Sequence, residues 1–332
     1  MKEANAIVQA ILDAENIVIT SHRSPDGDSI GSSLGLYHFI KQLGKNAIIC
    51  HPDPCPDFIM WAKGDVEILD FENSQEEIEG HLKNADLLFS LDYNAAHRLG
   101  RDMEPAFTAA TGKKIMIDHH LDPDDYASIT VSEPEICSTS QLIYEVIAGS
   151  DNLNLLNKAI GMPLYLGIMT DTGSFRFSSV SPRTHNIIAS LIENGTDHTA
   201  VHEATFGNNR IDKMKLRGYI IAERLDFMED IGVAIVSVTE KELERFNFIK
   251  GDTEGVVNIA LSMEGVKMAV FMRESDDMIK MSFRSTGDTV VNVLANEHFN
   301  GGGHKNASGG ASFESLDETI AKFKEVAPKY FG

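Results

Sequence analysis

The sequence predicts an α/β protein, in which an N-terminal domain built on a parallel sheet is followed by a smaller α+β domain. With 332 residues, the chain exceeds the size at which one hydrophobic core usually keeps growing, and 42% hydrophobic residues are enough for two cores. Short apolar runs alternate with helical patterns in the first half, whereas strands and helices are mixed after about residue 228. We expect domains at 1–205 and 229–332, joined by a linker helix at 206–228.

The first elements predict a βαβ unit. An amphipathic helix is indicated over 6–14, and the apolar run NIVIT at 16–20 is typical of a buried parallel strand. Apolar residues then recur at helical spacing from Ile30 until Gly44 ends the pattern, and AIIC at 47–50 predicts the next strand.

The remaining elements follow from the same patterns. In the first domain we expect strands at 86–91 and 114–117 and helices at 138–147, 155–170 and 182–193. A long charged amphipathic helix is predicted over 212–227. Beyond it the sequence predicts strands at 232–238, 267–272 and 278–283 and helices at 288–299 and 315–331.

Net charge, cysteine content and the distribution of apolar residues restrict the binding partners and the compartment of this protein. A formal net charge of -21 argues against binding to long duplex nucleic acid, which requires an excess of Lys and Arg on one face, but bound metal ions could still attract a short anionic substrate. Three cysteines are too few for a disulfide framework. The N-terminus is acidic rather than basic, and no apolar run approaches the ~18 residues that span a bilayer, so we expect a cytoplasmic protein without a membrane partner.

Acidic and imidazole side chains follow the predicted strands. These are His22, Asp26 and Asp28 after 16–20, Asp92 after 86–91, Asp118, His119 and His120 after 114–117, and Asp171 at the end of 155–170. Because ligands bind beyond the carboxyl ends of parallel strands, we expect these residues to converge on one rim of the sheet. Carboxylates gathered there would repel one another unless cations were bound.

Each residue alone has a simpler interpretation. Pro25-Asp26-Gly27 is ordinary turn chemistry, Asp28 could cap the following helix, and Asp92 could merely end a strand. Together, a ligand set of carboxylates and imidazoles without thiolates suits manganese, iron or zinc better than calcium, and also admits magnesium. Two manganese ions sharing a carboxylate would lie ~3.5 to 4 Å apart and clamp a phosphoester for attack by an activated water.

The H-x3-D-x-D spacing at His22, Asp26 and Asp28, followed by Asp92, the D-H-H sequence at 118–120 and Asp171, resembles the DHH phosphoesterase family in residues and in order. The resemblance implies that one Mn(II) ion is held by His22, Asp26 and Asp92 and a second by Asp28, Asp92, His119 and Asp171. It also implies that Asp92 bridges the ions, that His120 faces the substrate phosphate, and that Asp118 orients the imidazole pair.

The segment FNGGGHKNASGGASF at 299–313 lacks the glycine spacing of a P-loop, and by itself a turn is the simpler interpretation. It resembles the GGGH motif of the DHH-associated domain, which implies that Gly302, Gly303 and His304 contact the substrate. Arg284 occupies the place of a family arginine that engages a substrate phosphate, although an exposed strand arginine would look the same. Arg98 is a further candidate, with a salt-bridged surface arginine as the alternative.

The resemblance extends over catalytic domain, linker helix and associated domain. It indicates the compact nano-RNase subgroup, which degrades RNAs of two to five nucleotides to mononucleotides and converts 3'-phosphoadenosine 5'-phosphate (pAp) to AMP. An inorganic pyrophosphatase or exopolyphosphatase, a phosphodiesterase for pApA or a cyclic dinucleotide, and a nucleotide-binding sensor remain alternatives. The first lacks its basic Ser-Arg-Lys-Lys motif here, and the intact set of candidate ligands argues against the last. A homodimer is compatible with this interpretation.

Overall fold

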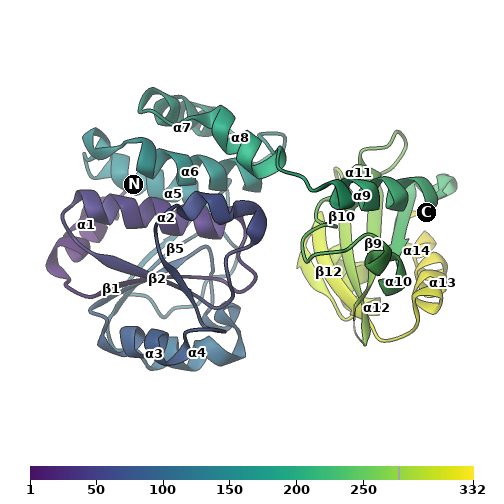
Figure 1. Ribbon diagram of the computed structural model, residues 1–332, viewed down its shortest axis with the longest axis horizontal. Coiled ribbons are helices and arrows are strands. Elements are labelled where there is room, and N and C mark those ends of the chain that lie inside the picture. Colours follow the sequence, from purple (N-terminus) through teal and green to yellow (C-terminus); the bar gives the residue numbers. More distant parts are fainter. Residues whose placement is uncertain (276) are drawn as a thin grey trace. The chain divides into compact units, whose positions relative to one another are not determined.

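The computed structural model describes residues 1–275 and 277–332 and divides them into two compact units, Met1–Asn208 and Asn209–Gly332 (Figure 1). The first unit contains a parallel sheet covered by helices, and the second contains a mixed sheet with its own helices. The predicted fold class is therefore confirmed. Among the described residues, no helix has the length and apolar character needed to span a bilayer.

The first sheet is parallel throughout, with the order β3-β2-β1-β4-β5-β6. Its strands are β1 (Ile17–Ser21), β2 (Ala47–His51), β3 (Ile68–Asp70), β4 (Leu87–Leu91), β5 (Lys113–Asp118) and β6 (Ile129–Ser132). The four predicted strands are present, whereas the edge strands β3 and β6 were not predicted because they are short and only partly apolar. The strand order reverses between β1 and β4, which is where open α/β sheets bind ligands.

Helices cover both faces of this sheet. On one side lie α1 (Ala4–Asp13), α2 (Gly27–Gln42), α5 (Thr139–Gly149) and α6 (Lys158–Asp171), with α7 (Pro182–Glu193) and α8 (His198–Phe206) packed outside them (Figure 1). On the other side lie α3 (Gln75–Asn84) and α4 (Gly100–Ala109). Short 3-10 turns occupy η1 (Asp57–Lys63), η2 (Ala96–Leu99) and η3 (Leu153–Leu155).

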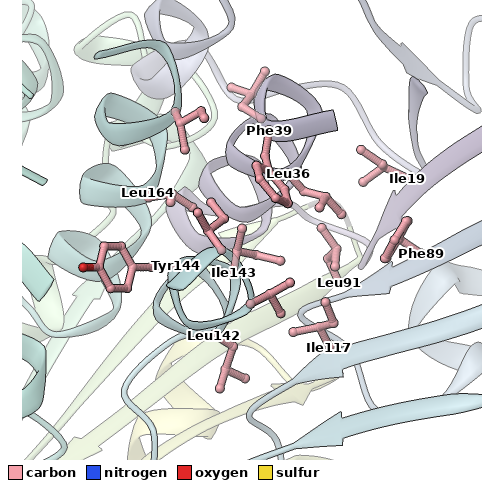
Figure 2. Packing of buried hydrophobic residues seen from close by; sticks show 14 of the residues in the cluster. Ile19, Leu36, Phe39, Phe89, Leu91, Ile117, Leu142, Ile143, Tyr144 and Leu164 are labelled. Carbon is pink, nitrogen blue, oxygen red and sulfur yellow. The ribbon is translucent and has the colours of Figure 1, made fainter. Parts of the chain in front are cut away.

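The main core of the first unit lies between the sheet and α2, α5 and α6. Figure 2 shows Ile19, Phe89, Leu91 and Ile117 of the strands facing Leu36 and Phe39 of α2, Leu142 and Ile143 of α5, and Leu164 of α6. All nine are fully buried, which removes nearly all of their apolar surface from water and contributes about 1.5–3 kcal/mol for each side chain.

Glycines allow α2 and α6 to approach closely. A Cβ on Gly31 would lie 2.4 Å from the carbonyl oxygen of Pro163, and one on Gly35 would lie 2.3 Å from the side chain of Leu164. Only hydrogen at these positions lets the backbones pack at this separation. The close packing fixes the start of α2, which carries Asp28, against the helix that ends at Asp171.

The second unit contains a mixed sheet with the order β11-β12-β10-β9-β8-β7. Its strands are β7 (Leu225–Met228), β8 (Val233–Val238), β9 (Met268–Ser275), β10 (Met278–Ser285), β11 (Gly302–His304) and β12 (Ala307–Ser312). Its helices are α9 (Ile211–Glu223), the 3-10 turn η4 (Glu229–Ile231), α10 (Glu240–Arg245), α11 (Val256–Leu261), α12 (Asn292–His298), α13 (Leu316–Val326) and α14 (Pro328–Phe331). One face packs against α9, α10 and α11, and the other against α12 and α13.

Two predicted segments contain strands that the local patterns did not indicate. The helix expected over 212–227 ends at Glu223, and β7 follows because residues 225–228 pair antiparallel with 233–236. The glycine-rich segment contains strands β11 and β12 in addition to its turn. In both places, pairing with a neighbouring strand outweighed the local sequence preference.

Candidate metal centre

His22 and Asp26 lie in the loop between β1 and α2. Asp26 caps α2: its Oδ1 accepts hydrogen bonds from the backbone N–H groups of Asp28 and Ser29, each at 3.0 Å. The alternative that Asp28 is the capping residue is therefore wrong. Asp26 Oδ1 lies 3.9 Å from His22 Nε2, so the cap also holds this carboxylate beside the imidazole.

Asp92 follows β4, adjacent to β1 at the reversal in strand order. Its Oδ2 lies 3.3 Å from His22 Nε2, and its Oδ1 lies 3.5 Å from His119 Nε2. The residue is 2% exposed and has a φ of 64°, a left-handed conformation that costs most residues about 1–2 kcal/mol. The two oxygens of one buried carboxylate thus face two different imidazoles.

The D-H-H segment ends β5. Asp118 Oδ1 lies 2.7 Å from His120 Nδ1, and its Oδ2 accepts the His120 backbone N–H at 2.9 Å. His119 instead has its Nδ1 3.1 Å from the carbonyl oxygen of Ile136. Asp118 therefore orients His120 alone, whereas the resemblance implied that it orients both imidazoles; the partner of His119 is the backbone carbonyl of Ile136.

Asp28 and Asp171 lie on the side of the cluster that contains His119. Asp171 Oδ2 lies 3.3 Å from His119 Nε2, and Asp28 Oδ2 lies 4.0 Å from the same atom. Asp28 is fully buried, and α6 reaches it through a glycine: a Cβ on Gly167 would lie 2.7 Å from Asp28 Oδ1 and 1.9 Å from Ser140 Oγ.

The potential ligand atoms form three groups, each with all its atoms within 4.8 Å of one another. They are His22, Asp26 and Asp92; Asp28, His119 and Asp171; and Asp92, His119 and His120. Two ligands that are each about 2.1 Å from one ion lie about 3.0–3.4 Å apart at right-angled or tetrahedral geometry. The separations of 3.3 and 3.5 Å around Asp92 and His119 are close to this range.

Burial and mutual repulsion shift the pKa values of the acids. Burial, reinforced by the Asp92 carboxylate, raises the pKa of Asp28 to about 8, and burial together with Asp28 and Asp92 raises the pKa of Asp171 well above its usual range. Burial would also raise the pKa of Asp92, but hydrogen bonds from His119 and His22 outweigh it and hold this pKa well below its usual range.

The pKa values of the imidazoles are raised, although burial acts to lower them. Burial by itself would lower both pKa values, yet the contacts with Asp92 and Asp26 raise the pKa of His22 to about 9, and contacts with Asp92, Asp28 and Asp171 raise that of His119 to about 10. The cluster therefore balances its negative charge with protons. Divalent cations would do the same and displace these protons, so the donor set fits metal ions.

Two of the candidate substrate residues of the second unit, Arg284 and His304, lie in one row of its sheet. Arg284 on β10 and His304 on β11 are both paired with Ala307 on β12. Directly opposite residues of neighbouring strands point to the same face, so Arg284 and His304 flank a small side chain. Gly303 has a φ of 136°, and a Cβ there would lie 2.7 Å from the Ala307 carbonyl oxygen, which restricts this position to glycine.

Gly302 belongs to the same strand as His304 and is exposed. Arg98 lies in η2 of the first unit, six residues after Asp92 in the sequence. Its carbonyl oxygen accepts the backbone N–H of Arg23 at 2.9 Å, which ties η2 to the loop that carries His22.

No pattern in the sequence pointed to the residues that support the cluster. Thr139 and Ser140 at the start of α5 donate their backbone N–H groups to Asp28 at 2.6 and 2.8 Å, and the Thr139 hydroxyl donates to Asp92 Oδ1 at 3.1 Å. The Ser-Thr-Ser sequence at 138–140 signals a helix start, but nothing in it indicates a carboxylate that lies 111 residues away in the chain.

Both units of this chain resemble known proteins in sequence. Residues 16–168 match the DHH family, N-terminal domain, and residues 230–330 match the DHHA1 domain. The bifunctional oligoribonuclease and PAP phosphatase NrnA of Bacillus subtilis is 29% identical over 98% of each chain. The cyclic-di-AMP phosphodiesterase GdpP of Bacillus subtilis is 25% identical over 99% of this chain and 50% of its own length.

An exopolyphosphatase-related protein from Bacteroides fragilis, known from its crystal structure, is 39% identical; the match covers 99% of this chain and 96% of that one, with a TM-score of 0.96. The fold and the site thus define the class of protein: an α/β protein with a cluster of Asp and His side chains that can hold divalent metal ions. It belongs to the DHH family of metal-dependent phosphoesterases.

Proposed function

We propose that this protein hydrolyses RNAs of two to five nucleotides to mononucleotides and converts pAp to AMP. The observation that carries the proposal is the Asp92 carboxylate, whose two oxygens face His22 and His119 within 3.5 Å. Similarity to NrnA over 98% of both chains supports the substrate class. The cytoplasm is the proposed compartment, in agreement with the absence of disulfides among the three free cysteines.

The proposed ligands divide between two ions, preferably Mn(II), with Mg(II) or another divalent ion as substitutes. His22, Asp26 and Asp92 would hold one, and Asp28, Asp92, His119 and Asp171 the other. When bound, such ions supply the positive charge that activates a water and neutralises the reacting phosphate. No side chain then has to act as the nucleophile.

The chain's own residues would orient the phosphate. The contact between His120 Nδ1 and Asp118 Oδ1 fixes the imidazole, so Nε2 is the nitrogen that would face a phosphate oxygen. Arg98, Arg284, Gly302, Gly303 and His304 are the proposed substrate-binding residues. Arg284 and His304 would bind anionic groups on either side of Ala307, whose methyl group leaves room for them.

A second candidate is hydrolysis of a cyclic dinucleotide or of linear pApA, because the cyclic-di-AMP phosphodiesterase GdpP matches 99% of this chain. Short RNAs, pApA and cyclic di-AMP share a phosphodiester between ribonucleosides, whereas pAp carries only phosphate monoesters. They differ at the ends: a linear RNA and pAp carry a terminal group for Arg284 and His304, whereas a ring has none. Turnover of cyclic di-AMP or pApA without turnover of pAp or of an unphosphorylated diribonucleotide would therefore favour this candidate over the first.

The proposal is tested by turnover with Mn(II) on pAp, a diribonucleotide, a long single-stranded RNA, pyrophosphate and cyclic di-AMP. We expect phosphate from pAp and mononucleotides from the diribonucleotide, both lost in Asp92→Asn. Asp13→Asn, an exposed carboxylate on α1, is the matched control and should retain full activity. Turnover of pyrophosphate alone, or processive degradation of the long RNA, would contradict the proposal.

A further inference from the structure

The start of α5 contacts three residues of the candidate metal centre. Ile136, just before the helix, accepts at its carbonyl oxygen from His119 Nδ1 at 3.1 Å. The first two backbone N–H groups of α5 bind both oxygens of Asp28, and the Thr139 hydroxyl binds Asp92 Oδ1 at 3.1 Å. This short segment thus touches Asp28 of α2 and the residues that directly follow β4 and β5, Asp92 and His119.

The geometry at Asp92 makes the Thr139 hydroxyl a directional contact. Asp92 Oδ1 lies 3.5 Å from His119 Nε2 and Oδ2 lies 3.3 Å from His22 Nε2, so rotation of the carboxylate would move one oxygen away from each imidazole. Thr139 is fully buried, and its hydroxyl donates to Oδ1. A buried hydrogen bond of this kind opposes such rotation.

The donor is itself held in place. Ser138 caps α5 by accepting the Gln141 N–H at 3.1 Å. Gln141 donates to Glu145 at 3.0 Å and accepts from Thr184 of α7 at 2.9 Å, and Glu145 pairs with Arg183. Because this buried network ties the first turns of α5 to α7, Thr139 is anchored by packing that does not involve the metal ligands.

We propose that Thr139 is a positioning residue, whose hydroxyl orients the Asp92 carboxylate so that each oxygen serves a separate metal ion. The inference rests on the proposed two-ion centre. It adds a residue outside the set of potential ligands, and it assigns the helix start a function beyond capping. Outer hydrogen-bond partners of metal ligands typically change metal affinity by about 10- to 100-fold.

The test compares Thr139→Val, Thr139→Ser and wild type for Mn(II) binding by isothermal titration calorimetry and by electron paramagnetic resonance. Valine has nearly the same shape and keeps the backbone N–H that binds Asp28, but it lacks the hydroxyl. We expect about 10- to 100-fold weaker Mn(II) binding in Thr139→Val and a weaker spin-coupled signal from paired ions. Thr139→Ser should bind Mn(II) within about threefold of wild type, because it retains the donor.

Thr205→Val is the control, because this buried hydroxyl bonds to a carbonyl of its own helix α8 and to no ligand. In turnover, Thr139→Val should regain most of its kcat at saturating Mn(II), a recovery that a misfolded protein would not show. If Thr139→Val folds poorly, the comparison of Thr139→Ser with Thr139→Ala gives the same contrast.

Three results overturn the inference, and they are distinguishable. Equal Mn(II) binding by wild type and Thr139→Val removes the role of Thr139 and leaves the proposed function intact. Equal weakening in Thr139→Ser and Thr139→Val shows that packing at this position matters and the hydroxyl does not. Absence of Mn(II) binding by the folded wild type removes the two-ion centre together with the inference.

Discussion

The Asp92 carboxylate lies 3.3 Å from His22 Nε2 through one oxygen, while its other oxygen faces away from that imidazole toward His119. His22 follows β1 and Asp92 follows β4, strands that pair in parallel with Ser21 opposite Leu91. The contact is therefore a consequence of strand order, since the ends of adjacent parallel strands meet at one edge. Two predictions concern this geometry and the packing around it, and two concern the second unit.

Replacing Asp92 with Asn should remove the acid shared by the two proposed ion sites. Because bound ions contribute several kcal/mol to transition-state stabilisation, we expect kcat/KM to fall by about 10²- to 10⁴-fold. The Mn(II) stoichiometry, measured by equilibrium dialysis, should also fall below that of wild type. A variant that keeps wild-type stoichiometry would show that Asp92 is not a shared ligand.

Adding one methyl group at Gly167 should disturb the candidate metal centre through Asp28 and Ser140. The new Cβ in Gly167→Ala would overlap Ser140 Oγ and Asp28 Oδ1, so we expect a loss of about 1–3 kcal/mol in unfolding free energy together with weaker Mn(II) binding. Gly80→Ala on α3 is the matched control. Its Cβ has no neighbour within 4 Å, so it should stabilise the helix by up to about 1 kcal/mol. Equal stability of the two variants in urea titrations would rule out this overlap.

Glu242 should make the second unit sensitive to acid. Burial would raise its pKa, but hydrogen bonds from the Thr239 backbone, Tyr219 and Arg224 outweigh burial and lower the pKa to about 2. Because the pKa is lowered, the stabilisation is complete above the usual value of 4.5 and is lost as the pH falls toward 2.

For Glu242→Gln we expect a loss of about 1–3 kcal/mol in unfolding free energy at pH 7, and a difference from wild type that shrinks toward pH 2. Urea unfolding at both ends of this range measures it. Glu244→Gln, an exposed residue of the same helix, should change little at either pH. A difference that is constant across this pH range would mean that the carboxylate charge is not responsible.

Arg284 should act on substrate binding more than on the chemical step. Its planar guanidinium can form paired hydrogen bonds with a phosphate, which lysine cannot reproduce. We expect Arg284→Lys to raise the KM for pAp by about 10-fold with a smaller change in kcat. Lys280→Ala, which removes an exposed cation from the same strand, should leave KM unchanged. A fall in kcat alone would place Arg284 in another role.

Much of the fold followed from local patterns. Each of the strands β1, β4 and β5 contains a short apolar run that is followed by acidic or imidazole side chains, so both the strands and the rim of the sheet were predictable. The end of the helix at Glu223 was not predictable from the sequence. The helix was expected to continue to Phe227, but Leu225–Met228 becomes a strand through its pairing with β8. Local preference contains no information about that partner.

The sequence by itself determined which side chains could form a metal centre, because the spacing of His22, Asp26 and Asp28 and the D-H-H segment places each one at or shortly after the end of a strand. Only the tertiary structure decided what supports them. The Thr139 hydroxyl reaches Asp92 and its backbone N–H reaches Asp28, across 47 and 111 residues of chain. Such contacts have no period or motif in the sequence, because they depend on how closely the glycines of α2 and α6 let the helices pack.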